Sequence, residues 1–367
     1  MSRDGQLFVC LATVLVAVGS IMAHSASMTS RPTDRDEAHL VRHAAYLGIG
    51  LVAATAAAAT PAGFWRRGAP WFFAGTVLLL AAVLVPGLGT EVNGARRWLR
   101  FGPVSVQPSE IAKLTLPLLL AHLAVKRRES LQHWVKGTVP VLWPAGILFP
   151  LVLLEPDLGT TLFLAAGAAS LLFLAGWPVR NFLMGVAVAV PALAALILVQ
   201  PYQVRRLTGF VAAWTEPSSA PYQVSQALIT LGSGGVWGTG LGQGWQKLSF
   251  LPEANTDFVF AVIGEELGLV GTLGLLAAWC AFFAVGLRLI RPIEARRYEF
   301  LCAATLLLQL FGQAIANMAV VTALLPPKGI ALPLVSYGGS NLVTSLVAIG
   351  MILSFSRSIE SPAGEQS

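Results

Sequence analysis

The chain has 367 residues, of which 55% are hydrophobic and only 11% are charged, and its formal net charge is +6. A soluble domain carries roughly 25% charged residues. The composition therefore excludes a soluble enzyme and predicts an all-α polytopic membrane protein, with membrane lipids and no nucleic acid among its partners.

Apolar runs long enough to cross a bilayer recur along the chain, and we expect about ten transmembrane helices of roughly 17 residues or more. The first run has few basic residues before it and no cleavage site of small residues, so we interpret it as a retained helix. The predicted spans are 6–24, 40–60, 71–89, 108–125, 138–154, 158–176, 181–200, 258–290, 298–325 and 333–356.

The connections between these spans fall into two sets. One set holds the acidic stretch Asp34–Glu37 and the long segment 201–257. The other set is short and densely basic, with Arg66, Arg67, Lys126, Arg127, Arg128, Lys136, Arg180, Arg288, Arg291, Arg296 and Arg297. Basic connections are typically cytoplasmic. Both termini, including the short tail 357–367, are therefore predicted to be cytoplasmic, and 201–257 to be extracytoplasmic.

Two polar segments interrupt what is otherwise a single membrane domain over 1–367. Segment 90–107 mixes cations with aromatics, which is typical of an interfacial segment at the lipid headgroups. Segment 201–257 lies between helices seven and eight and is too long for a simple connection. Its aromatic residues and glycine clusters at 232–235 and 238–244 favour an ordered, tightly turned loop over a disordered one.

Asp257 stands where this long polar segment ends and an apolar helix begins. A carboxylate at a membrane boundary is costly unless it is used or paired. Together with Arg97 and Lys328 it is predicted to face outward. This is where a membrane enzyme would keep a general base.

Two further carboxylate motifs have a structural and a chemical interpretation. Glu110 and Lys113 lie three apart, hence on one helix face, and form either a structural ion pair or a site in which Glu110 orients Lys113 toward an anionic head group. Glu155 and Asp157 flank a proline. They could bind a cation or share acid–base work, but an outer turn whose acids cap the next helix is favoured.

Cations gather locally on the predicted outer face, against the general trend. They are Arg96, Arg97, Arg100, Arg205, Arg206 and Lys328. They could bind anionic lipid heads, or they could converge on a substrate whose leaving group is a diphosphate.

Polar residues inside the later helices favour structural roles. We expect a pairing role for Glu265 and Glu266, and interhelical hydrogen bonds from Gln313 and Asn317. At the start of the last span, the segment Ser336–Asn341 contains two adjacent glycines. A glycine pair near a helix start can present backbone amides to an anion, although this signal alone is weak.

Taken together, these stretches closely resemble the SEDS family of cell-wall polymerases (shape, elongation, division and sporulation). The matching segments are 94–99, 106–113, 155–160, 232–235, 250–268 and 333–340. They follow the family's order over nearly the whole chain. The short termini favour the elongation branch (RodA), and 327–329 with the Val262–Glu266 run also suits the division branch (FtsW).

The resemblance implies a ten-helix peptidoglycan glycosyltransferase that polymerises lipid II, an undecaprenyl-diphosphate-linked disaccharide-pentapeptide, outside the cytoplasmic membrane. It also implies a class B penicillin-binding protein as partner. The family's essential aspartate falls on Asp257, its interfacial arginine and tryptophan on Arg97 and Trp98, and its Glu-Ile-Ala-Lys pair on Glu110 and Lys113.

An inverting displacement needs one base to take the proton of the attacking sugar hydroxyl, and Asp257 is the predicted base. The predicted substrate-binding residues are Arg97, Trp98, Glu110, Lys113, Arg206, Lys328, Ser336, Gly338 and Gly339. No metal motif is visible, although a divalent cation, Mg²⁺ or Mn²⁺, could help to hold the diphosphate. A lipid II flippase and a non-enzymatic scaffold are the alternative functions.

Overall fold

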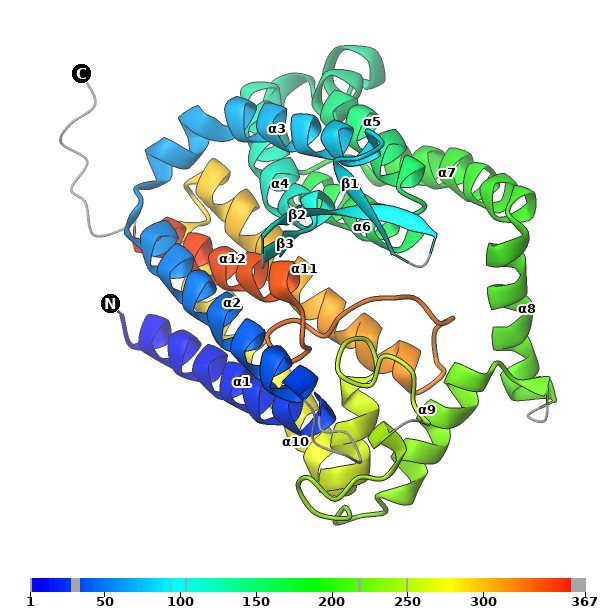
Figure 1. Cartoon of the computed structure of the whole chain (residues 1–367). Coiled ribbons are helices and arrows are strands. Elements are labelled where there is room, and N and C mark those ends of the chain that lie inside the picture. Colours follow the sequence, from blue (N-terminus) through cyan, green and yellow to red (C-terminus); the bar gives the residue numbers. More distant parts are fainter. Residues whose placement is uncertain are drawn as a thin grey trace.

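The computed structural model describes residues 2–27, 34–92, 94–102, 104–216, 219–248 and 250–357 (Figure 1). Ten long apolar helices form the bundle: α1 (Arg3–Ser27), α2 (Asp34–Ala59), α3 (Ala62–Leu84), α4 (Pro108–Lys126), α5 (Val139–Leu154), α6 (Leu158–Leu174), α7 (Val179–Val199), α10 (Val259–Ile290), α11 (Arg297–Val321) and α12 (Gly339–Arg357). Within the described residues, nine helices are long and apolar enough to cross a membrane, and α6 is a shorter apolar helix. The ten predicted spans are confirmed as helices.

The third predicted span, 71–89, is wrong at both ends. α3 begins at Ala62 and ends at Leu84, so Arg66 and Arg67 lie in its first two turns rather than in a connection. Proline is well tolerated where a helix starts, and Pro61 precedes the first helical residue here. The predicted tail 357–367 lies outside the described residues beyond Arg357.

Segment 90–107 contains a small sheet, and its predicted interfacial position stays a prediction. Strands β1 (Gly89–Val92), β2 (Ala95–Phe101) and β3 (Val104–Val106) pair antiparallel in that order. In a sheet, the backbone N–H and C=O groups of the strands form hydrogen bonds with one another. In β2, Arg96 pairs with Glu91 and Trp98 with Thr90, so Arg97 is the extra residue of a β-bulge. β-bulges are frequent next to active sites, where they change the direction in which a side chain points.

The long loop 201–257 contains two helices that were not expected, α8 (Pro201–Thr215) and α9 (Tyr222–Ser233). The predicted tight turns are confirmed at Gly235, Gly238, Gly240 and Gly242, which all have positive φ. A side chain at Gly238 would meet the carbonyl oxygen of Glu266. The loop therefore folds closely against α10.

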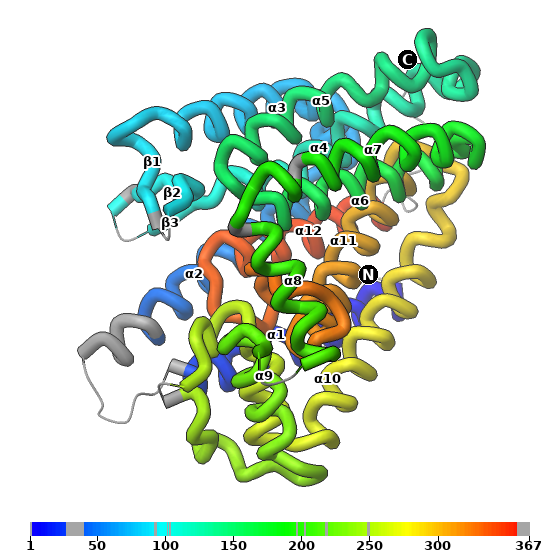
Figure 2. The backbone as a smooth tube through the Cα atoms, turned by 90° about the vertical axis from the view of Figure 1, so that its right-hand side faces the viewer, coloured from blue at the N-terminus to red at the C-terminus, as the bar shows by residue number. Residues whose placement is uncertain are grey.

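The helices of the bundle differ in how much of their surface is buried within the protein, with α12 the most buried and α7 the least. The share of buried residues in the apolar window is 83% for α12 and 67% for α4 and α11, but 0% for α7. Figure 2 shows α7 and α8 running along one side of the bundle, with the sheet at one end. The end of the bundle that carries the sheet also carries the polar residues described next.

Candidate functional site

Asp257 lies two residues before the start of α10, in an irregular segment that neighbouring elements hold through hydrogen bonds to three of its carbonyls. The backbone N–H of Tyr337 donates to the Asn255 carbonyl at 2.8 Å. The Ser336 hydroxyl donates to the carbonyl of Thr256, and Asn317 Nδ2 donates to that of Asp257 at 2.7 Å. Groups from α11 and from the segment before α12 therefore position the aspartate.

The Asp257 side chain is half-buried. A Cβ added at Gly329 would be 3.1 Å from Asp257 Oδ2, so glycine leaves room for this carboxylate. The pKa of Asp257 is raised to about 7, first by burial and then by the charge of Glu253, against the opposing charges of Arg206 and Arg97. A carboxylate with a pKa near neutrality is matched to general base catalysis.

Arg97 connects the sheet to the turn between α5 and α6. Its Nε donates to the carbonyl of Glu155 at 3.0 Å, and its Nη2 donates to the carbonyl of Pro156. Nε also lies 3.9 Å from Asp157 Oδ2. The guanidinium thus fixes the turn while its charge stays near Asp257, on which it acts electrostatically.

Arg206 of α8 contacts the segment that carries Lys328. Arg206 Nη1 of α8 donates to the carbonyl of Pro327 at 3.3 Å. Burial and the Arg206 charge lower the pKa of Lys328, whereas Asp157 opposes this. Two of the four predicted diphosphate-binding cations, Arg97 and Arg206, therefore act electrostatically on Asp257, and Lys328 is near Arg206 and Asp157.

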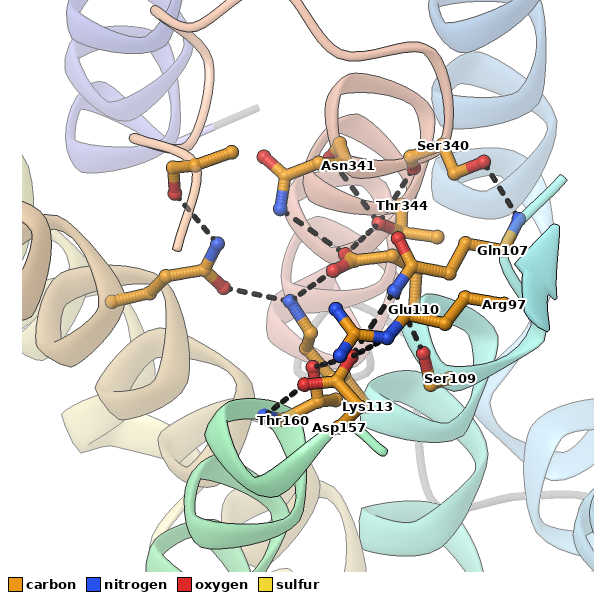
Figure 3. A network of polar contacts seen from close by, with 12 residues as sticks. Arg97, Gln107, Ser109, Glu110, Lys113, Asp157, Thr160, Ser340, Asn341 and Thr344 are labelled. Atoms are coloured by element: carbon orange, nitrogen blue, oxygen red, sulfur yellow. Dashed lines mark hydrogen bonds and ion pairs between the residues drawn. The ribbon is translucent and has the colours of Figure 1, made fainter. Parts of the chain in front are cut away.

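The fourth cation, Lys113, lies in a separate buried network (Figure 3). Its Nζ is 2.6 Å from Glu110 Oε1 and donates to Gln313 Oε1 at 2.9 Å. Glu110 Oε2 accepts from Asn341 Nδ2 and from the Thr344 hydroxyl. The predicted ion pair is confirmed, and with this neutralised charge Lys113 makes a structural contact between α4, α11 and α12.

Asp157 caps α6, as the favoured interpretation of this motif predicted. Its carboxylate accepts from the backbone N–H of Thr160 at 3.0 Å and from the Thr160 hydroxyl at 2.9 Å. Gln107 Nε2 also donates to it at 3.4 Å, and the Gln107 backbone N–H donates to Ser340 Oγ (Figure 3). Gln107 was missed as a candidate, although it lies in the 106–113 motif.

Glu155 differs from Asp157, because its side chain is fully buried and both carboxylate oxygens are without a hydrogen-bond partner among the described residues. Burial, and then the charge of Asp157, raise its pKa to about 8. The neutral acid is the form that such a site stabilises at neutral pH.

The remaining predicted substrate-binding residues take part in packing. The Ser336 hydroxyl accepts from Leu332 N at 2.7 Å besides donating to Thr256. A Cβ at Gly339 would lie 2.3 Å from the ring of Tyr46, so this glycine permits contact between α2 and α12. Gly338 precedes α12, and Trp98 is half-buried in β2. Their contact with substrate stays a prediction.

Glu265 and Glu266 form the structural site expected of them. Glu266 Oε1 accepts from Lys247 Nζ at 2.5 Å and from Ser25 Oγ at 2.7 Å, and both charged side chains are fully buried. Glu265 Oε1 accepts from the backbone N–H groups of Trp245 and Gln246. The two carboxylates therefore hold the glycine-rich loop to α10 and α1.

The described residues contain no group of three or more His, Cys, Asp or Glu side chains that could hold a metal ion. Mg²⁺ is commonly bound by one or two carboxylates together with substrate phosphates. The predicted divalent cation stays a prediction.

A family model described as "Cell cycle protein", which groups FtsW, RodA and SpoVE, matches residues 5–361. The chain belongs to this family. A probable peptidoglycan glycosyltransferase FtsW of Legionella pneumophila is 39% identical over 343 residues, covering 92% of this chain and 87% of the relative. One of Geobacter sp. M18 is 37% identical over 348 residues, covering 94% and 95%.

Solved structures have the same fold. A chain of a peptidoglycan synthase complex that coordinates polymerization and crosslinking superimposes with a TM-score of 0.79, at 28% identity, over 96% of this chain and 98% of that chain. The rod shape determining protein RodA of Thermus thermophilus superimposes with a TM-score of 0.69, at 30% identity, over 96% and 97%. The protein is a multi-pass membrane protein of the SEDS family.

Proposed function

We propose that this protein is a peptidoglycan glycosyltransferase that polymerises lipid II into β-1,4-linked glycan at the outer face of the cytoplasmic membrane. The observation that carries the proposal is Asp257, a half-buried carboxylate with a pKa raised to about 7, on which Arg97 and Arg206 act electrostatically. The names of the FtsW relatives support the reaction class.

Each group has a role that follows from its chemistry. Asp257 takes the proton of the acceptor sugar hydroxyl as that oxygen attacks the anomeric carbon of the donor. The bond to the undecaprenyl diphosphate breaks as the new glycosidic bond forms, with inversion of configuration. Arg97, Arg206 and Lys328 stabilise the negative charge that builds up on the departing diphosphate. A bound divalent cation would supply further stabilisation of that charge.

The held backbone around Asp257 supports this assignment. The carbonyls of Asn255, Thr256 and Asp257 are all hydrogen-bonded to other elements, so the backbone that carries the carboxylate is fixed. Groups fixed before the reaction lose little freedom in the transition state.

The relatives favour the division branch over the elongation branch that the short termini suggested. The Legionella and Geobacter relatives, at 39% and 37% identity, are named FtsW, whereas the RodA structure shares 30% identity. We therefore assign the protein to septal wall synthesis, with elongation as the alternative. Depletion of the protein in its host should give filaments in the first case and round cells in the second.

The structural likeness to a synthase complex that couples polymerization to crosslinking supports a transpeptidase partner, and a class B penicillin-binding protein fits that role. The basic connections predict that both termini are cytoplasmic. With an even number of spans, the end of the bundle that carries the sheet and Asp257 is then extracytoplasmic.

The test is polymerisation of purified lipid II by the purified chain, with and without its transpeptidase, beside an Asp257→Ala variant. We expect long glycan from the wild type and none from the variant, with equal thermal stability. Equal polymer from both would refute the role of Asp257. Lipid II translocation into vesicles without any polymer would instead support the flippase.

A further inference from the structure

Two polar side chains of α11 contact the irregular connection 322–338 between α11 and α12. Gln313 and Asn317 lie four residues apart, so they share one face of the helix. Both are buried, with exposed fractions of 5% and 1%. A buried amide is costly unless it is hydrogen-bonded, so the partners of these two side chains indicate what they hold in place.

Asn317 joins the candidate base to the connection 322–338. Its Nδ2 donates to the carbonyl of Asp257 and to the carbonyl of Ile330, each at 2.7 Å. Both hydrogens of the amide nitrogen are used in this way. Directly before Ile330 stands Gly329, where an added Cβ would lie 3.1 Å from Asp257 Oδ2. Asn317 therefore fixes the backbone of the base relative to the segment that borders its carboxylate.

Gln313 makes the corresponding contact one residue further along the connection. Its Nε2 donates to the carbonyl of Ala331 at 2.8 Å, and its Oε1 accepts from Lys113 Nζ at 2.9 Å. Lys113 Nζ in turn lies 2.6 Å from Glu110 Oε1. One side chain thus connects the buried ion pair of α4 to the segment beside Asp257.

These hydrogen bonds resist displacement because a buried group that loses its partner cannot turn to water instead. Removal of the Asn317 amide would take hydrogen bonds from two carbonyls, one of them that of Asp257 itself. Removal of the Gln313 amide would take one from the Ala331 carbonyl and one acceptor from Lys113. Asn317 acts on the base directly and Gln313 acts one step away, so the effect of Asn317 should be the larger.

We propose, on the basis of the polymerase activity proposed above, that Asn317 and Gln313 are positioning residues for Asp257. Through Gln313, the Glu110–Lys113 pair holds the segment beside the carboxylate in place. The ion pair then contributes to the reaction without contacting the substrate, because it keeps the base and its surroundings in one arrangement.

The test measures lipid II polymerisation by Asn317→Leu, which removes the amide and keeps a similar volume. We expect kcat to fall about tenfold, because a small misplacement of a catalytic group is costly, and KM to change by less than about twofold. Gln309→Leu is the matched control. Gln309 is also buried on α11, and its Nε2 has no hydrogen-bond partner among the described residues, so its kcat should stay within about twofold of the wild type.

Repeating Asn317→Leu in an Asp257→Asn background separates positioning from a general structural role. If Asn317 acts through Asp257, the further loss of kcat there should be less than about twofold. A further loss equal to that in the wild-type background would overturn the proposal. Gln313→Leu should lower kcat less than Asn317→Leu does, and Glu110→Gln with Lys113→Met should add nothing to that loss. A raised KM in this last variant would overturn the role assigned to the ion pair.

A second measurement needs no polymerisation and so separates this proposal from the proposed activity. In Asp257→Cys, the alkylation rate of the introduced thiol reports how firmly the position is held, and peptide mass spectrometry distinguishes it from the three native cysteines. Adding Asn317→Leu should raise this rate about threefold or more, because the local backbone opens more readily, and adding Gln309→Leu should not.

An unchanged alkylation rate would overturn the positioning role of Asn317. Full polymerase activity of Asp257→Asn would refute the proposed base, whereas a raised alkylation rate would still support the positioning of residue 257. The melting temperature of each variant shows that it is folded, and Asn317→Ser serves if Asn317→Leu is not.

Discussion

Two acidic sites lie at either end of the buried first part of α10, and they are built in opposite ways. Glu266 is fully buried, and its carboxylate accepts hydrogen bonds from Lys247, Ser25 and the backbone of Gly242. Asp257 keeps access to solvent, and within the described part of the chain its carboxylate accepts no hydrogen bond. The hydrogen-bonding capacity of the Glu266 carboxylate is therefore used within the protein, whereas that of the Asp257 carboxylate is available to a substrate.

The difference separates a structural acid from a chemical one. A buried carboxylate that is paired with a cation and hydrogen-bonded by its neighbours has little capacity left to bind a substrate or to accept its proton. A carboxylate whose backbone is held while its oxygens are unpaired can accept a proton during a reaction. The neighbouring Glu265 also belongs to the structural class, since it accepts from the amides of Trp245 and Gln246.

The strongest test of the difference between these two acids is to remove the charge of Asp257 without changing the shape of its side chain. Asp257→Asn should lower the rate of lipid II polymerisation by about 10²- to 10⁴-fold, the usual contribution of a general base. Its melting temperature should not fall, because the substitution removes the desolvation cost of the charged form. A loss of activity accompanied by unfolding would show that Asp257 is a structural acid too.

The second prediction concerns the structural site. Lys247→Met leaves Glu266 buried without its cation, and breaking a buried ion pair in this way typically costs about 3–5 kcal/mol. Thermal unfolding of the purified variant should occur well below that of the wild type. Removing both charges with Lys247→Met and Glu266→Gln should restore part of the stability, and a double variant less stable than the single one would contradict the pairing.

The third prediction sharpens the account of the space around Asp257. Gly329→Ala places a methyl group 3.1 Å from Asp257 Oδ2, a contact close enough to displace the carboxylate. We expect a loss of about tenfold in kcat, because small misplacements of a catalytic group are costly. Gly232→Ala in α9 is the matched control, since its added Cβ would meet no atom within 4 Å among the described residues. Equal activity of both variants would contradict the prediction that a methyl group at position 329 displaces the Asp257 carboxylate.

Much of this architecture could be predicted from sequence because hydrophobic length determines where a helix can cross a membrane. The ten runs of apolar residues correspond to ten helices. The start of α3 was missed because Arg66 and Arg67 interrupt the apolar run, although charged residues are readily accommodated in the first turns of a helix that leaves the bilayer. The three-stranded sheet was missed because β1 and β3 have only four and three residues.

For the site, the motifs identified Asp257 and its cations, but spacing along the chain could not show which charges are neutralised. Lys113 was predicted either to pair with Glu110 or to contact an anionic head group, and the structure shows the pair, with Gln313 as a second partner of the ammonium group. Gly329 was not singled out, because the need for glycine arises only from the approach of Asp257, 72 residues earlier in the chain. Contacts of this kind depend on tertiary packing and leave no local pattern.

The pH dependence of lipid II polymerisation tests the central claim most directly. Because burial raises the pKa of Asp257 to about 7, the aspartate is protonated at lower pH and cannot accept the proton of the attacking hydroxyl. We predict that kcat/KM falls about tenfold for each pH unit below this pKa and levels off above it, while the residual activity of Asp257→Asn shows no such step. A wild-type profile that stays flat from about pH 5 to 8 would contradict the assignment of Asp257 as the base.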